Sequence, residues 1–558
     1  MARHMLKIAR CEERFVRAVE ADTGLPSLIA RLLVARGMCS PEAIEAFLTP
    51  KLETLSDPFL LPDIERGVAK AVEMIEGNRR IGLFGDYDAD GITSVALMKN
   101  FLKQVGIVPD IYLPKRQDGY GLSVEAVKRF SEKSIELLIC LDCGSSNRAE
   151  VEAAHQLGMQ TIVVDHHEVA DTPAQPYALI NPKREGSRFP TRELAACGVT
   201  FFFLLALRRA LSERGLLRGT INLKREMDLV ALGTVADMVP LTGDNRLLVK
   251  FGLENMRRKP RAWFRSFVKK HIVRKGYVDE LTLGFGIAPR INAAGRVSDP
   301  EIALTFLTTD RESEAEALLS KLNEANRKRQ DIEEAILKDA MEQLEVEGLG
   351  RENSVVLFRE DWPIGVLGIV AQRLVERCGK AAIIVTRTEK AWRGSARGLE
   401  GMDLHQTIAS VSSLLLAFGG HKHACGITLS GENLLPLREA FEREVKKSLE
   451  GFVKEVYVDA VVEFGDLTKD VVEMIDMLAP FGVGNPRPSL LLPPSAISIY
   501  NGFAKVTDDK NRTWHGSVQR RTSLPGAPVA RVVATPTIRE EMGDKFVHLV
   551  IKEFVPVD

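Results

Sequence analysis

Short apolar runs alternate with longer segments of helical periodicity between residues 76 and 250 of the chain. One such run, 81–84, is followed by a segment expected to be helical, 92–102. This alternation predicts βαβ units, because two parallel strands need a crossover connection, which is usually a helix. The pattern therefore predicts an α/β lobe with a parallel sheet.

The second half of the chain shows three further patterns. Residues 302–347 are dense in Glu, Lys, Ala and Leu without Pro or Gly, which predicts a long helix that connects two lobes. Strand-like runs at 354–358 and 381–385 flank a helical segment, 365–377, so a second α/β lobe is expected. From about residue 455, short β-rich segments separated by turn signals favour a small barrel.

These patterns divide the chain into five predicted units. They are an N-terminal helical region (1–75), a parallel-sheet α/β lobe (76–300), a connecting long helix (301–348), a second α/β lobe (349–452) and a C-terminal small β-barrel (453–558). With 45% hydrophobic and 27% charged residues, the chain has the composition of a globular protein, which argues against disorder.

The sequence also bears on the cellular location of the protein and on the role of its cysteines. No apolar run reaches the roughly 18 residues of a membrane span, and residues 1–4 lack the apolar core of a signal peptide. A soluble, cytoplasmic protein without a membrane partner is therefore expected. Seven cysteines in 558 residues are not a disulfide framework. Cys140 and Cys143 have the spacing of a zinc or redox pair, but no second pair completes a zinc site.

The net charge of −1 means that any binding of nucleic acid must depend on a local basic surface. Residues 257–275 contain nine Lys and Arg and no acidic residue, interleaved with Trp263, Phe264 and Phe267. Such a segment suits a single strand, whose phosphates pair with cations and whose bases stack on rings. It equally suits an amphipathic helix with buried aromatic side chains. The sequence leaves both interpretations open.

Acidic residues and histidines lie just beyond several apolar runs. They are Asp86, Asp88 and Asp90 after 81–84, Asp142 after 135–141, Asp165, His166 and His167 after 161–164, and Asp237 after 229–236. Ligands of α/β proteins bind at the carboxyl ends of parallel strands. Carboxylates with one imidazole suit Mg²⁺ or Mn²⁺. We therefore expect a multi-metal site assembled from separate strand ends; the alternative is an acidic, solvated turn.

These segments resemble the four signature motifs of the DHH phosphoesterase superfamily. The motifs are residues 86–90, Asp142-x-Gly144, Asp165-His166-His167 and residues 233–237. Residues 119–122 and 289–296 resemble one branch in particular, the RecJ family of single-strand-specific 5′→3′ DNA exonucleases. The resemblance extends over about residues 30–558.

The resemblance implies a DHH domain, a DHH-associated (DHHA1) domain and a C-terminal OB-fold that binds single-stranded DNA. It implies degradation of single-stranded DNA to 5′-mononucleotides, in DNA repair and recombination. Two divalent metal ions, Mn²⁺ or Mg²⁺, are the implied cofactors. A monomer is implied, with a single-strand-binding protein and a helicase as further partners.

The resemblance also assigns catalytic metal ligands. Asp88 would serve one ion and Asp90 the other, Asp142 would bridge them, and His166 and Asp237 would complete the second site.

Other residues of the same motifs receive supporting roles from the resemblance. His167 would sit beside the scissile phosphate. Asp86 would either ligate metal or fix the loop, and Asp165 would orient its neighbours.

A second group of residues resembles the family's nucleic-acid-binding surface. Ser395 and Arg397, with Arg116 and Arg290, resemble the pocket for a terminal 5′-phosphate, and Tyr120 is a candidate for base stacking. The other candidates in this group are Asn292, Arg296, Gly419, Gly420 and His421.

The chain departs from the family pattern at a few positions. Pro363 follows Trp362 where a histidine is usual, Cys425 replaces an alanine after the Gly-Gly-His motif, and the sequence drifts after Arg296. The proposed metal ligands are all intact, so these departures put affinity or substrate range in doubt rather than activity.

Two other functions are consistent with the superfamily. A phosphodiesterase for short oligonucleotides or cyclic dinucleotides would generally lack the C-terminal β-rich unit and the segment 289–296. An inactive DNA-binding scaffold would be expected to lose the aspartates, which are present here.

Overall fold

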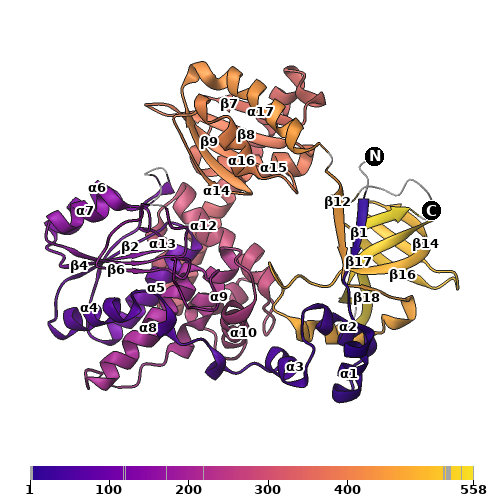
Figure 1. Ribbon diagram of the computed structural model, residues 1–558, viewed down its shortest axis with the longest axis horizontal. Coiled ribbons are helices and arrows are strands. Elements are labelled where there is room, and N and C mark those ends of the chain that lie inside the picture. The colour runs from indigo at the N-terminus through magenta and orange to yellow at the C-terminus, as the bar shows by residue number, and fades with distance from the viewer. Residues whose placement is uncertain are drawn as a thin grey trace.

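The computed structural model describes residues 4–116, 119, 121–170, 172–217, 219–450, 452–519, 522, 529–541 and 543–556. Figure 1 shows two α/β lobes and, beside them, a β-rich unit. The first helices of the chain lie next to the C-terminal strands in that unit.

The first lobe is built on a five-stranded sheet in which all neighbouring strands are parallel, as predicted. Its strands are β2 (Ile81–Gly85), β3 (Asp110–Tyr112), β4 (Leu137–Leu141), β5 (Gln160–Val164) and β6 (Ala178–Ile180). The order is β3-β2-β4-β5-β6: β3 is added on one side of β2, and β4 and the later strands are added on the other. The strand order therefore reverses between β2 and β4. Ligands of open α/β sheets bind outside the carboxyl ends of the strands at such a reversal.

Helices cover both faces of this sheet (Figure 1). Consecutive strand residues point to opposite faces. Leu83 and Ile139 therefore contact one group of helices, and Phe84 and Leu138 contact the other. The first group is α4 (Ile64–Glu76), α5 (Ala89–Gln104) and α8 (Ala196–Glu213), and the second is α6 (Val124–Glu132) and α7 (Arg148–Gln156). The first core continues into α9 (Met227–Ala236), α10 (Gly243–Arg258), α11 (Ala262–Lys269), the π-helix η5 (Thr282–Ile287) and α12 (Ala288–Val297).

The basic segment 257–275 is part of this core. Trp263, Phe264 and Phe267 on α11 are all buried, so they are packing residues and not a stacking surface for bases. The Arg261 side chain is only 9% exposed, and it pairs with Glu226 at 3.0 Å and Asp228 at 2.5 Å. The structure thus decides between the two interpretations of the aromatic residues in favour of the buried one.

The connection between the lobes consists of two helices, α13 (Pro300–Thr308) and α14 (Glu312–Val346). The long helix is present as α14, but the prediction of one continuous helix from residue 302 is wrong. Thr309 leaves the helical conformation with ψ 140°, and its hydroxyl accepts a hydrogen bond from the backbone N–H of Arg311 at 3.2 Å. Such side-chain bonds compete with the helix backbone and favour helix ends.

The second lobe has a sheet of five strands in the order β10-β11-β9-β8-β7. They are β7 (Ser354–Arg359), β8 (Ala381–Arg387), β9 (Trp392–Arg397), β10 (Ala417–His421) and β11 (Ala424–Leu429). Only β7 and β8 are parallel; the others pair antiparallel. Helix α15 (Leu367–Cys378) packs on one face, and α16 (Leu404–Ser410) and α17 (Leu434–Ser448) pack on the other.

The C-terminal unit is rich in strands, as predicted. They are β13 (Ala460–Val461), β14 (Leu490–Tyr500), β15 (Phe503–Thr507), β16 (Thr513–Val518), β17 (Val529–Glu541) and β18 (Asp544–Pro556). The pairings run from β14 through β15, β16, β18 and β17 and return to β14, which is the closed circuit that a small barrel requires. Helix α18 (Lys469–Ile475) contributes to the same core.

The N-terminal region is shared between two cores. Helices α1 (Glu13–Thr23), α2 (Ser27–Ala35) and α3 (Pro41–Leu48) pack with the C-terminal strands, whereas α4 packs under the first sheet. Strand β1 (His4–Ile8) pairs in parallel with β12 (Lys454–Val458), the first strand after the second lobe. Among the described residues, no helix is long and apolar enough to cross a membrane.

Candidate metal centre

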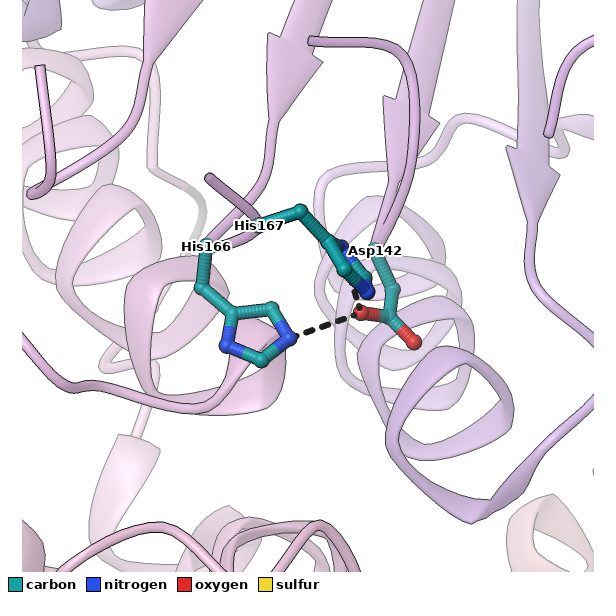
Figure 2. Close-up of side chains that lie close together, drawn as sticks. All are labelled: Asp142, His166 and His167. Atoms are coloured by element: carbon teal, nitrogen blue, oxygen red, sulfur yellow. Dashed lines mark ion pairs between the residues drawn. The ribbon is translucent and has the colours of Figure 1, made fainter. Parts of the chain in front are cut away.

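The loops after β4 and β5 bring an aspartate and two histidines together (Figure 2). The Oδ1 atom of Asp142 lies 3.3 Å from His166 Nε2 and 3.9 Å from His167 Nδ1. Asp142 has φ 65°, a left-handed conformation that Asp adopts more readily than most residues. This turn directly after β4 places its carboxylate at the carboxyl edge of the sheet.

The junction between β2 and α5 delivers two more carboxylates, Asp88 before the helix and Asp90 in its first turn, and hydrogen bonds fix both of them. Asp88 caps α5 and accepts from the backbone N–H groups of Asp90 at 3.0 Å and Gly91 at 3.1 Å. Asp90 accepts from Ala196 at 2.7 Å and Cys197 at 2.9 Å, the first two residues of α8. A helix N-terminus favours negative charge, so α8 stabilises the Asp90 carboxylate.

Helix α12 supports this junction from the other side. Asn292 accepts a hydrogen bond from the backbone N–H of Ala89 at 2.7 Å. Gly295 permits the approach, because a Cβ there would lie 2.5 Å from the backbone oxygen of Tyr87. Asn292, predicted as a nucleic-acid-binding residue, is therefore in contact with the acidic junction itself.

Asp165 orients both histidines that follow it. Its Oδ1 accepts from the backbone N–H of His166 at 2.8 Å and from Nδ1 of His167 at 2.8 Å, and its Oδ2 accepts from Ser145 at 3.0 Å. Burial favours the neutral acid, but these bonds outweigh burial and hold the pKa of Asp165 below its usual value. Burial opposes protonation of His167 too, yet the same partnership raises the pKa of His167 to about 9.

Asp237 reaches the site from the end of a helix, not a strand. The apolar segment before it is α9, and the backbone N–H of Asp237 bonds to the carbonyl of Gly233 at 2.9 Å. The expectation that separate strand ends supply every ligand is therefore wrong for this residue. Its Oδ2 nevertheless lies 3.7 Å from His166 Nε2, and Asp90 Oδ2 lies 3.8 Å from the same atom.

The electrostatics of the site call for a cation. Burial, with repulsion from neighbouring aspartates, raises the pKa of Asp86 to about 8 and that of Asp237 to about 9, and it raises the pKa of Asp142 well above its usual value. Burial also lowers the pKa of His166, which favours the neutral imidazole that ligates metals. So many buried acids are unfavourable together unless positive charge lies between them.

Three overlapping groups of side chains could hold an ion. Within each group, the ligand atoms lie within 4.8 Å of one another. The groups are Asp86, Asp88 and Asp142; Asp90, His166 and Asp237; and Asp142, His166 and His167.

The donor set fits hard divalent ions such as Mg²⁺ and Mn²⁺, since it is mostly carboxylate oxygen. Two buried atoms, Asp86 Oδ1 and His166 Nε2, have no hydrogen-bond partner among the described residues, as expected of atoms that face a metal.

Arginines gather where the second lobe faces this edge. Arg397 on β9 donates to Ser395 Oγ at 2.7 Å, and Arg296 at the end of α12 donates to the carbonyl of Gly365 at 2.9 Å. Burial lowers the pKa of both guanidinium groups to about 10, with a further lowering contribution from the charge of Arg116. Arg116 itself stacks over the ring of Tyr87, 5.4 Å from its centroid.

The other predicted substrate residues are placed less uniformly. Arg290 points to α14, where it donates to Asn323 Oδ1 at 2.7 Å. His421 lies with Gly419 and Gly420 on the exposed edge strand β10. Partial burial of its ring and the nearby charges of Arg397 and Lys183 lower the pKa of His421. Tyr120 lies outside the described residues.

Several residues that complete the site carry no obvious sequence signal. The N–H groups of Ala196 and Cys197 are backbone atoms, and Asn181 is an ordinary-looking residue after β6. Its side chain nevertheless donates to the carbonyl of His167 at 2.9 Å and to Ser145 Oγ at 3.1 Å.

Comparison with known proteins first defines the class. Residues 80–234 match the sequence model described as "DHH family, N-terminal domain", and residues 352–447 match the one described as "DHHA1 domain". The first covers the parallel sheet with most of the acidic edge, and the second covers the lobe that carries Arg397. The fold and the site thus define a DHH protein with an associated DHHA1 lobe.

Relatives that match most of this chain narrow the class to one family. The chain is 33% identical to the single-stranded-DNA-specific exonuclease RecJ of Bacillus subtilis (strain 168), over 87% of this chain and 61% of that protein. It is 34% identical to the RecJ of Dickeya dadantii (strain 3937), over 86% of each. The chain therefore belongs to the RecJ family, and it spans about three fifths of the Bacillus relative.

Solved structures agree with this membership. RecJ from Thermus thermophilus in complex with Mn²⁺ superposes with a TM-score of 0.82 and 27% identity, over 100% of this chain and 80% of that one. The complex of the same protein with Mg²⁺ gives a TM-score of 0.76 at 25% identity, over 100% and 79%.

Proposed function

We propose that this chain is a metal-dependent exonuclease that degrades single-stranded DNA from the 5′ end to 5′-mononucleotides, with two Mn²⁺ or Mg²⁺ ions. The observation that carries the proposal is the overlap of three ligand groups at one sheet edge, in which Asp142 and His166 each belong to two. Relatives named as single-stranded-DNA-specific exonucleases support the substrate, and the Mn²⁺ and Mg²⁺ complexes of RecJ support the ions.

The acidic edge would divide its side chains between two ions. When bound, a pair of divalent ions about 3.5–4 Å apart lowers the pKa of water and stabilises charge on the attacking and leaving oxygens. Asp142 would bridge them. Asp86 and Asp88 would serve one ion; Asp90, His166 and Asp237 would serve the other.

The protein groups would orient the substrate around this edge. Asp165 holds the Nδ1 proton of His167, which fixes the ring for a hydrogen bond to a phosphate oxygen. Arg116, Arg296 and Arg397 form a cationic cluster, and within the described part of the chain Arg296 and Arg397 donate to carbonyl and hydroxyl oxygens rather than to a carboxylate. A terminal 5′-phosphate would relieve their mutual repulsion and can accept bidentate hydrogen bonds.

The proposal includes a cellular setting. The chain would act in the cytoplasm as a monomer, in DNA repair and recombination, alongside a single-strand-binding protein and a helicase. The C-terminal unit, residues 453–558, would be an OB-fold that holds the strand, and the other four units would have the bounds given above.

The test is an exonuclease assay with Mg²⁺ and with Mn²⁺ on strands labelled separately at each end. Substrates are single-stranded DNA, duplex DNA and a dinucleotide. Metal-dependent release of mononucleotides from the 5′ end of long single strands, with duplex spared, is expected. Cleavage confined to the dinucleotide would make the protein an oligonucleotide phosphodiesterase, and binding without cleavage would make it a scaffold.

A further inference from the structure

Asp237 is held differently from Asp88 and Asp90. Asp88 and Asp90 accept backbone hydrogen bonds that fix their carboxylates. Among the residues that the structure describes, the chain donates no hydrogen bond to the Asp237 carboxylate, which lies 3.7 Å from His166 Nε2. Its position therefore depends on the main chain at the end of α9 and on where that chain goes next.

The segment after Asp237 packs on the first lobe and is also tied to the C-terminal unit. Val239 and Leu241 are buried in the core of the first lobe, and Asn245 on α10 donates to the carbonyl of Pro240 at 3.0 Å. Met238 itself takes a left-handed conformation with φ 61° and is 71% exposed, so it contributes little to this packing. Three residues later, the backbone N–H of Leu241 donates to the carbonyl of Val483 at 2.7 Å. Val483 belongs to residues 480–486, a turn that we name the docking turn.

Two glycines of the docking turn allow this close approach. A Cβ on Gly482 would lie 2.8 Å from Leu241 Cδ1. A Cβ on Gly484, which has φ 74°, would lie 3.1 Å from the Cβ of Pro240 and from Cγ2 of Thr242. Any larger residue there would push on the segment that leaves Asp237.

The docking turn is itself rigidly held. Asn485 is buried, and its side-chain amide donates to the carbonyls of Leu478 at 2.9 Å and Pro480 at 2.8 Å. Arg246 on α10, also buried, donates to the carbonyl of Ala479 at 3.0 Å and to that of Phe47 at 2.8 Å. The first lobe, the N-terminal segment and the C-terminal unit are thus joined within a few residues of one metal ligand.

We propose that the docking turn is a positioning element for Asp237, so that the affinity of one of the two metal ions depends on the C-terminal unit. This inference rests on the proposed two-ion function. It assigns the C-terminal unit a role at the metal centre, in addition to holding DNA. Groups that orient a ligand in this way typically affect metal affinity about 10- to 100-fold.

The test compares Gly484→Ala with Gly502→Ala in the full-length chain. Gly502 has φ 78°, and a Cβ at this position would meet nothing within 4 Å, so its substitution imposes the same backbone strain without touching the first lobe. Mn²⁺ binding is measured directly by titration calorimetry and by the electron paramagnetic resonance signal of free Mn²⁺. We expect one of the two Mn²⁺ sites of Gly484→Ala, the one that Asp237 serves, to lose about 10-fold in affinity, and we expect Gly502→Ala to match the wild type.

A double variant shows whether the effect passes through Asp237. In the Asp237→Ala background, which lacks that ligand, adding Gly484→Ala should change the remaining Mn²⁺ affinity less than about twofold, because coupled residues are not additive. An equal loss in both backgrounds would overturn the inference. Gly482→Ala, which approaches the same segment through Leu241, replaces Gly484→Ala if that variant does not fold.

The outcomes separate this inference from the function on which it rests. If the wild type binds two Mn²⁺ ions and Gly484→Ala binds them as well as Gly502→Ala does, only the positioning role fails. If the wild type binds no Mn²⁺, the proposed two-ion function fails and the positioning role fails with it.

Discussion

The acidic edge of the first lobe and the surface that faces it, where Arg397 of the second lobe lies with Arg116 and Arg296 of the first, are opposite in charge but show the same electrostatic effect. At the edge, burial and mutual repulsion raise the pKa of Asp86 and Asp237 to about 8 and 9. On the facing surface, burial and neighbouring positive charge lower the pKa of Arg296 and Arg397 to about 10. Each region concentrates like charges in a poorly solvated place, which is unfavourable until a ligand of opposite charge binds.

The difference between the regions is the kind of ligand that relieves the repulsion. Fixed carboxylates a few ångströms apart suit small divalent cations. Planar guanidinium groups suit a phosphate, which accepts two parallel hydrogen bonds. The comparison therefore predicts that mutations at the edge change metal binding and catalysis, whereas mutations on the facing surface change recognition of the DNA end.

The largest effect is expected from Asp142→Asn. This substitution keeps the size of the side chain, and Asn adopts the left-handed φ of 65° as readily as Asp does. It removes the charge shared by two ligand groups, so hydrolysis of single strands should fall at least about 10³-fold, or about 4 kcal/mol in the barrier. Single-turnover kinetics measures this, with the circular dichroism spectrum as the control for folding. Near-normal turnover would rule out the bridging role.

Asn292→Ala should have the next largest effect, because it leaves the backbone N–H of Ala89 without its acceptor and loosens the start of α5, where Asp88 and Asp90 lie. Mn²⁺ affinity should fall about 10- to 100-fold, as measured by calorimetry. Asn323→Ala is the matched control, since it removes the partner of Arg290 and leaves the start of α5 intact. Equal Mn²⁺ affinity in the two variants would contradict the supporting role of Asn292.

Arg397→Ala should act on the DNA end and not on the metals. Loss of hydrogen bonds to a charged phosphate costs about 1.5–3 kcal/mol, so binding of 5′-phosphorylated strands should weaken about 10- to 100-fold, with unphosphorylated strands less affected. Fluorescence anisotropy in Ca²⁺, to limit cleavage, measures both. Arg387→Ala, which breaks an exposed pair with Glu360, is the control. An equal loss on both kinds of end would refute the phosphate pocket.

The smallest effect is expected in the basic segment 257–275. Arg265 pairs with Glu312 at 2.7 Å and Lys269 with Glu316 at 2.5 Å, both on exposed surface, and the aromatic residues between them are buried. Changing both cations to Ala should alter affinity for single strands less than about threefold, because these side chains support the contact between α11 and α14. A tenfold loss would show that this segment is a third substrate surface.

The sequence predicts the acidic edge well because the chemistry depends on strand ends. A buried strand has a clear apolar pattern, and Asp86, Asp142 and Asp165 follow theirs directly. The same pattern places Asp237 at a strand end, but its apolar run is a helix. A short, continuously apolar run does not by itself distinguish a buried helix from a buried strand.

Other features depend on tertiary contacts, which a local pattern does not contain. At the break after α13, the Thr309 hydroxyl bonds to Arg311 and Glu314 within a sequence that otherwise has a helical pattern. The local pattern left the burial of Trp263 open, because it depends on α13 and α14 packing against α11. The N–H groups of Ala196 and Cys197 at Asp90 are backbone atoms from a helix far along the chain, so no residue type marks them.

The most direct test of the account is anomalous scattering at the manganese edge from crystals of the wild type grown with Mn²⁺. The two-ion proposal predicts two peaks, one on each side of the Asp142 carboxylate. Asp88 should contact one peak, and Asp90, His166 and Asp237 should contact the other. A single peak, or peaks that Asp142 does not contact, would contradict the two-ion centre and the exonuclease mechanism built on it.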